Sequence, residues 1–77
     1  MTINDMKSGD SAQITHLDLL HPQAMRLLDL GFIPGTSITF LRRAPLGDPL
    51  VVEIRRRTLM LRKDEALAVS VSAEEKS

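Results

Sequence analysis

Two histidines and an aspartate stand close together in the chain as His16-x-Asp18-x-x-His21. Two imidazoles and a carboxylate are ligand types that bind divalent metal ions. Their spacing is poor for a joint site, because His16 falls at the end of an expected strand and His21 at the start of an expected helix. We therefore predict no metal site and no cofactor, and we keep His16, Asp18 and His21 as weak metal candidates.

Nucleophilic catalysis needs a hydroxyl or thiol beside a base that is itself oriented by a third group. Four of the hydroxyl residues in the N-terminal half have no such histidine–aspartate set in the sequence: Ser8, Ser11, Thr15 and Thr36. Gly31 and Gly35 bracket the end of a predicted helix, which is the wrong end for binding a phosphate. The sequence therefore predicts a protein that is not an enzyme.

A loop rich in proline and apolar residues is the strongest candidate for binding a partner. Its residues 44–50 read Ala-Pro-Leu-Gly-Asp-Pro-Leu, and we call residues 45–49 the tongue. Proline restricts the backbone at both ends of the tongue, and Gly-Asp provides a turn between them. We predict that the tongue binds a protein partner and that two arginines before it guide the approach; the residues are Pro45, Leu46, Gly47, Asp48, Pro49, Arg42 and Arg43. The alternative is a plain hairpin loop whose leucines fold back onto the core.

The formal net charge is zero, yet residues 40–63 hold seven basic and two acidic side chains. These arginines have three possible roles: solvated strand edges, docking onto an acidic protein face, or contact with nucleic-acid phosphates. The chain has two phenylalanines and no tyrosine or tryptophan, which argues against stacking on bases and against an aromatic groove for proline-rich peptides. We predict a protein partner and no nucleic acid.

Other features narrow the class of protein. The chain has no cysteine, which excludes a disulfide scaffold, a zinc ribbon and an iron–sulfur cluster. No apolar run approaches the roughly 20 residues that span a bilayer, and the N-terminus lacks a signal-peptide pattern. The sequence predicts a cytoplasmic protein without direct membrane insertion. It leaves the oligomeric state open, and a homo-oligomer is possible.

The apolar spacing predicts one strand and then one helix in the N-terminal half. Residues 12–17 alternate loosely, as in a strand. Pro22 suits the first position of a helix, Leu20 and Met25 stand where a hydrophobic staple would pack, and Gly31 suits the residue that ends the helix. The helix face predicted to be buried consists of Leu20, Ala24, Leu27 and Leu28.

The apolar period then changes to two, which predicts four further strands and a small antiparallel barrel of about five strands. A short helical turn is expected at residues 63–66, and residues 73–77 form a polar tail that we expect to fray. The expected fold is mainly β with an inserted helix, in one domain over residues 1–77. The predicted core is Ile14, Leu27, Leu28, Ile38, Phe40, Val52, Ile54, Leu59, Leu61, Val69 and Val71.

Three motifs in order resemble the FeoA family. They are Leu-Leu-Asp-Leu-Gly-Phe-Ile-Pro-Gly-Thr at residues 27–36, Ala-Pro-Leu-Gly-Asp-Pro at 44–49 and Leu-Arg-Lys-Asp-Glu-Ala at 61–66. The resemblance covers residues 6–72 and implies an SH3-like barrel. It also implies a small cytosolic accessory protein that binds FeoB, a ferrous iron transporter with a GTP-binding domain. Whether such a protein would activate, assemble or stabilise the transporter stays open.

The same domain occurs in iron-dependent repressors, so the resemblance implies an alternative function as a metal-responsive regulatory domain. One position departs from the family pattern. Arg56 stands where many members have glycine, and this argues against a tight turn with positive φ at that point.

Overall fold

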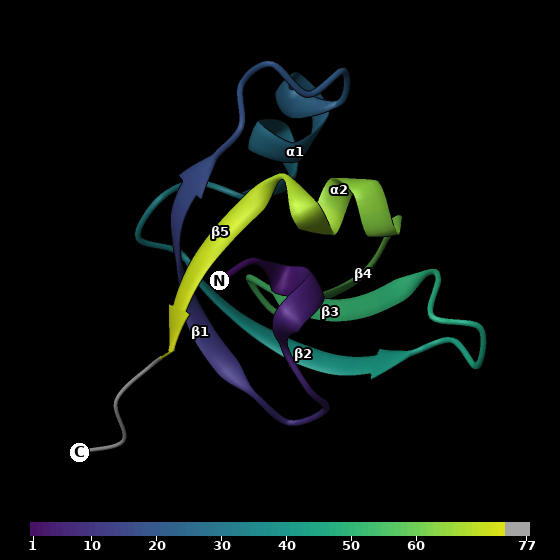
Figure 1. Ribbon diagram of the computed structural model, residues 1–77. Helices are drawn as coiled ribbons and strands as arrows, with labels where there is room; N and C mark the ends of the chain where they lie inside the picture. Colours follow the sequence, from purple (N-terminus) through teal and green to yellow (C-terminus); the bar gives the residue numbers. More distant parts are fainter. Residues whose placement is uncertain (74–77) are drawn as a thin grey trace.

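The computed structural model describes residues 1–73 and shows a strongly bent antiparallel sheet that curls into a small open barrel (Figure 1). The strand order is β4-β3-β2-β1-β5. The elements in chain order are the 3₁₀ turn η1 (Ile3–Asp5), β1 (Ser11–Leu17), α1 (Ala24–Leu30), β2 (Ser37–Arg43), β3 (Leu50–Ile54), β4 (Arg57–Leu61), α2 (Lys63–Leu67) and β5 (Val69–Ala73). The predicted mainly β fold with five strands and an inserted helix is confirmed.

The bend of the sheet arises at two irregular positions. The register of β1 against β5 shifts between Ile14 and His16, and that of β2 against β3 shifts between Phe40 and Arg42. An extra residue on one strand bends it and increases its twist. The sheet thereby wraps around one core, and α1 and α2 lie toward the same end of the barrel (Figure 1).

Nine of the eleven predicted core residues are buried, as the spacing predicts: Ile14, Leu27, Ile38, Phe40, Val52, Ile54, Leu61, Val69 and Val71. Leu28 and Leu59 are wrong as core residues, because each is only partly buried and packs against the core from its margin. On α1 the buried residues are Ala24 and Leu27. The buried face of this seven-residue helix is thus narrower than the predicted one.

The predicted helix start is also wrong. Leu20 is 93% exposed and Met25 is 72% exposed, so the two form no hydrophobic staple. The amide of Leu20 donates to the Asp18 carboxylate at 3.0 Å, and the amide of His21 donates to the Asp18 carbonyl at 3.1 Å. These bonds fold the segment before α1 into a turn, which delays the helix to Ala24.

The N-terminal segment contributes to the core without a periodic signal in the sequence. Ile3 and Met6 are buried, and Thr2 forms an isolated bridge with Ser70 of β5. At the other end, Ala73 pairs with Ala12 of β1, so the expected fraying is wrong at residue 73; residues 74–77 lie outside the described part of the chain.

A tight turn with positive φ joins β3 to β4 although it holds no glycine. Arg55 and Arg56 have φ values of 51° and 65°. The Arg57 guanidinium donates to the Leu30 carbonyl at 3.0 Å, and the Arg55 side chain lies against Gly31. The argument against such a turn at Arg56 is therefore wrong, because contacts with the end of α1 hold Arg55 and Arg57 on either side of it.

Gly31 ends α1 in a backbone conformation that L-residues disfavour. Its φ is +108°, and a Cβ added there would lie 3.1 Å from Cδ of Arg55. We expect Gly31→Ala to lower the free energy of unfolding by about 1–2 kcal/mol or more, since a left-handed conformation costs about that much for a residue with a Cβ. Urea titration followed by circular dichroism measures the loss.

Gly35→Ala is the matched control for this prediction. Gly35 has a similar φ of +96° but open space around the position of a Cβ. The two variants should share the backbone cost, and Gly31→Ala should lose more because of Arg55. An unchanged stability of Gly31→Ala would contradict the prediction.

Candidate functional site

The tongue is a closed loop with an exposed leucine at its tip. The Ala44 amide donates to the Pro49 carbonyl at 3.0 Å, and the Gly47 amide donates to the Ala44 carbonyl at 2.8 Å. Leu46 is 97% exposed. The alternative in which the leucines fold back onto the core is therefore wrong for Leu46; Leu50, at the start of β3, is buried in the core.

The two arginines before the tongue have different surroundings. The Arg43 guanidinium donates to the side-chain oxygen of Asn4 at 3.0 Å, to the Asn4 carbonyl at 2.7 Å and to the Gly47 carbonyl at 3.3 Å. It also lies over the ring of Phe40, 5.4 Å from the centroid. Arg43 thus holds the tongue against the N-terminal segment, whereas Arg42 is exposed and is the better placed of the two to meet a partner.

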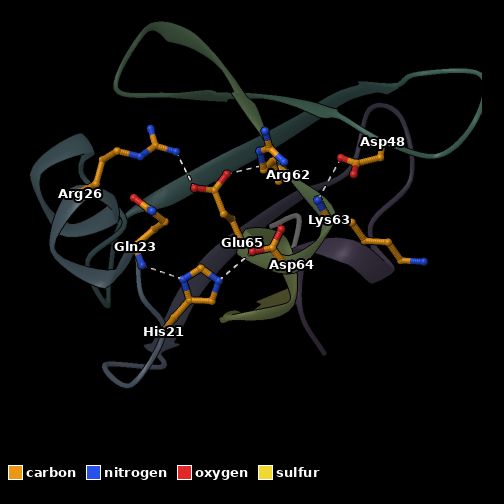
Figure 2. A network of polar contacts seen from close by, with 8 residues as sticks. All are labelled: His21, Gln23, Arg26, Asp48, Arg62, Lys63, Asp64 and Glu65. Atoms are coloured by element: carbon orange, nitrogen blue, oxygen red, sulfur yellow. Dashed lines mark hydrogen bonds and ion pairs between the residues drawn. The ribbon is translucent and has the colours of Figure 1, made fainter.

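The base of the tongue is also fixed to the start of α2. The Asp48 carboxylate accepts a hydrogen bond from the Lys63 amide at 3.0 Å (Figure 2). An acidic side chain at this place satisfies one of the amides that a helix leaves unpaired in its first turn. Only the tip of the tongue therefore projects freely, on a base that two separate contacts hold.

A buried carboxylate next to this base links α1 to α2. Glu65 is 2% exposed. One of its oxygens accepts a charge-assisted bond from the Arg26 guanidinium, and the other accepts a bond from the Arg62 amide at 2.9 Å (Figure 2). Both oxygens of this charged group thus have partners, as a buried charge requires.

We expect Arg26→Ala to lower the free energy of unfolding by about 1–3 kcal/mol, the cost of leaving a buried acceptor without its partner. Arg62→Ala is the matched control, because Glu65 bonds to the backbone amide of that residue and keeps this bond in the variant. Urea titrations of both variants measure the difference. Equal midpoints for the two variants would contradict the prediction.

Two of the three weak metal candidates, His21 and Asp18, form hydrogen bonds within the fold. His21 accepts a bond at Nδ1 from the Gln23 amide, and its Nε2 donates to the Asp64 carboxylate; both distances are 3.0 Å (Figure 2). The Asp18 carboxylate accepts from Leu20, and His16 lies exposed on β1. Among residues 1–73, no group of three or more histidine, cysteine, aspartate or glutamate side chains is arranged to hold a metal ion.

An open groove of about 430 Å³, which no local sequence pattern predicts, lies beside the base of the tongue. Asp48 and Pro49 of the tongue, the last residues of β4 and the Arg26 side chain of α1 line it. These residues are far apart in the chain, so no local pattern joins them. One sequence feature does point to this surface: Met60 is an apolar residue that the strand alternation places on the outer face, between the inward-facing Leu59 and Leu61.

Neither helix within residues 1–73 has the length and apolar character needed to cross a lipid bilayer.

Comparison with known proteins links this geometry to one family. The FeoA domain family model matches residues 1–73. The putative Fe(2+) transport protein A of Campylobacter jejuni is 31% identical over 72 residues, which cover 94% of this chain and 97% of that protein. A crystal structure of zinc-complexed FeoA from Stenotrophomonas maltophilia, described as a prokaryotic SH3 domain protein, has a TM-score of 0.82 at 32% identity. The match covers 94% of this chain and 89% of that one.

A longer relative carries a similar domain on the same chain as a transporter. The Fe(2+) transport protein A/Fe(2+) transporter FeoB fusion protein of Porphyromonas gingivalis is 31% identical over 71 residues. These residues cover 92% of this chain and 8% of the fusion protein, so the chain spans less than a tenth of that relative's length.

Proposed function

The chain belongs to the FeoA domain family, and from this premise we propose that it is a non-enzymatic accessory protein of ferrous iron uptake. It acts in the cytoplasm and binds the cytosolic part of an FeoB-type transporter. The observation that carries the proposal is the Porphyromonas gingivalis fusion, in which a similar domain and FeoB share one chain. Fusion raises the effective concentration of two domains relative to each other without adding a contact between them. Domains that are fused in one organism are therefore expected to bind each other when they occur as separate proteins.

The tongue is the proposed contact with the transporter. Leu46 is exposed on a loop whose base is held at Arg43 and Asp48, so it loses little conformational freedom when a partner covers it. More of the energy of its burial then contributes to affinity. Arg42 lies beside the loop and acts mainly on the rate of association with an acidic surface.

The alternative function, a metal-responsive regulatory domain of the iron-dependent repressor type, stays a prediction. It would need a set of metal ligands, and the three weak candidates instead bond within the fold or, for His16, stand apart on β1. No specific observation favours it over the accessory role.

Uptake of ferrous iron by cells tests the proposed function. A strain without this gene should accumulate less radiolabelled ferrous iron under reducing conditions, and a plasmid copy should restore the uptake. A strain without the transporter gene is the reference for complete loss. Undiminished uptake in the strain that lacks only this gene would contradict the proposal.

A further inference from the structure

The two edge strands of the sheet differ in what covers them. On β5, the Val71 amide donates to the Met1 carbonyl at 2.8 Å and Ser70 bridges Thr2, so the N-terminal segment lies along that edge. On β4, pairing within residues 1–73 is with β3 alone. One edge of the barrel is therefore covered by the chain itself, and the other is open.

The turn before β4 determines which backbone groups face the open edge. Ile54 and Arg57 flank the two-residue turn at residues 55–56 and pair with each other. Residues that flank such a turn exchange hydrogen bonds, and this bonding then alternates along an antiparallel pair. Leu59 and Leu61 therefore bond to β3, while the amides and carbonyls of Thr58 and Met60 point outward. Among the described residues, no segment outside β3 and β4 forms a backbone hydrogen bond with Thr58 or Met60, so nothing covers these outward groups.

The groove of about 430 Å³ lies at the end of this open edge, so an added strand would reach it with a side chain. Met60, Pro49 and Leu61 give it apolar surface, and its charged lining is two arginines, Arg26 and Arg62, and two carboxylates, Asp48 and Glu65. The Asp48 carboxylate accepts a hydrogen bond from the Lys63 amide. Figure 2 shows the two arginines on opposite sides of Glu65. Arg26 already pairs with Glu65. Within residues 1–73 the Arg62 guanidinium forms no ion pair or hydrogen bond with another side chain, so of the two arginines it is the one able to bind an added carboxylate.

Basic residues lie at both ends of the open edge. Arg55, Arg56 and Arg57 precede its outward-facing residues, and Arg62 and Lys63 follow them. A second copy of β4 paired in antiparallel fashion would bring the first group of one chain against the second group of the other. Like charges placed opposite each other destabilise strand pairing. The charge pattern thus disfavours a second copy and favours an acidic strand.

We propose that β4 accepts an extended, acidic segment of the transporter's cytosolic part as a sixth strand. The backbone of the segment bonds to Thr58 and Met60, and main-chain bonds of this kind supply affinity in strand addition. One of its carboxylates binds Arg62 in the groove, and another lies beside the arginines at residues 55–57, where β4 begins. This inference rests on the proposed function and adds a second contact beside the tongue.

Amide hydrogen exchange followed by nuclear magnetic resonance tests the proposal on the full chain. The probe is the purified cytosolic part of the FeoB-type transporter from the same organism. Exchange at Thr58 and Met60 should be fast in the free protein and at least about tenfold slower in the complex, because a hydrogen bond protects an amide until the structure opens. The amides of Leu59 and Leu61 are already bonded to β3 and should be protected in both states.

A pair of substitutions at one position separates the backbone from the side chain. Met60→Pro removes the outward amide, a change that edge strands tolerate, and it should weaken binding at least about tenfold, which corresponds to about 1.4 kcal/mol. Met60→Ala keeps the amide and should weaken binding several-fold less. If Met60→Pro does not fold, the exchange measurement on the unchanged chain decides.

Three other results would overturn the inference. In the first, a complex forms and the amide signals of residues 45–49 change, but Thr58 and Met60 exchange as fast as in the free protein. This result rules out the added strand and leaves the proposed function in place. The absence of any complex overturns both. Slow exchange at Thr58 and Met60 that appears without the transporter and grows with protein concentration identifies a second copy as the occupant of the edge.

Discussion

Replacing Leu27 by alanine should lower the free energy of unfolding by about 2–5 kcal/mol, the range for removing a fully buried leucine side chain. Leu27 lies on the face of α1 that packs into the core, and it has no exposed surface. Domains of this length have a total stability of roughly 4–12 kcal/mol. A single truncation can therefore remove a large part of the stability, and urea titration followed by circular dichroism will show it.

Leu28→Ala is the matched control, since it makes the same chemical change one residue further along the same helix. Leu28 is only partly buried at the margin of the core. It should lose clearly less stability than Leu27→Ala, because less apolar surface leaves the protein interior. Similar losses for the two variants, or a larger loss at Leu28, would contradict the placement of α1 on the barrel.

Leu46→Asp should abolish binding to the transporter's cytosolic part and the ferrous iron uptake that depends on it, while the barrel stays folded. Leu46 is 97% exposed, so a charge at this position costs the free protein little. In a complex, a fully buried leucine contributes about 1.5–3 kcal/mol, or roughly a tenfold to hundredfold change in affinity. A buried, unpaired carboxylate in its place adds a desolvation cost.

Leu20→Asp is the control for this second prediction, because Leu20 is 93% exposed but lies in the connection between β1 and α1. It should bind and support uptake as the unchanged protein does. Circular dichroism establishes that both variants fold. A folded Leu46→Asp variant that binds normally would contradict the role of the tongue.

The strands could be predicted because their signal is local. Ile38 and Phe40 on β2, like Val52 and Ile54 on β3, recur at a period of two, and the structure buries all four. The end of α1 was equally readable, since Gly31 adopts the left-handed conformation expected of a residue that ends a helix.

The errors arose where distant contacts override the local pattern. Ile3 and Met6 carry no periodic signal, and they are buried only because the N-terminal segment returns to cover β5. Leu20 fits the helical spacing, but its bond to Asp18 keeps it in a turn before α1. The same holds at residues 55–56, where contacts with the end of α1 support a turn that the sequence disfavours.

The candidate site was predictable only in part. Proline and glycine spacing indicated an exposed loop, and the exposure of Leu46 agrees with it. The sequence could not show that Arg43 bonds to Asn4, or that Met60, Pro49 and Arg26 share a groove, because these pairs of residues meet only through the curvature of the barrel.

The most direct test of the account is a calorimetric titration of the full chain with the purified cytosolic part of the FeoB-type transporter from the same organism. We expect saturable binding with one molecule of each protein in the complex, and loss of that binding in Leu46→Asp. A titration without a binding signal at concentrations of about 100 μM, where a complex of even modest affinity would form, would contradict the central claim that this protein binds the transporter.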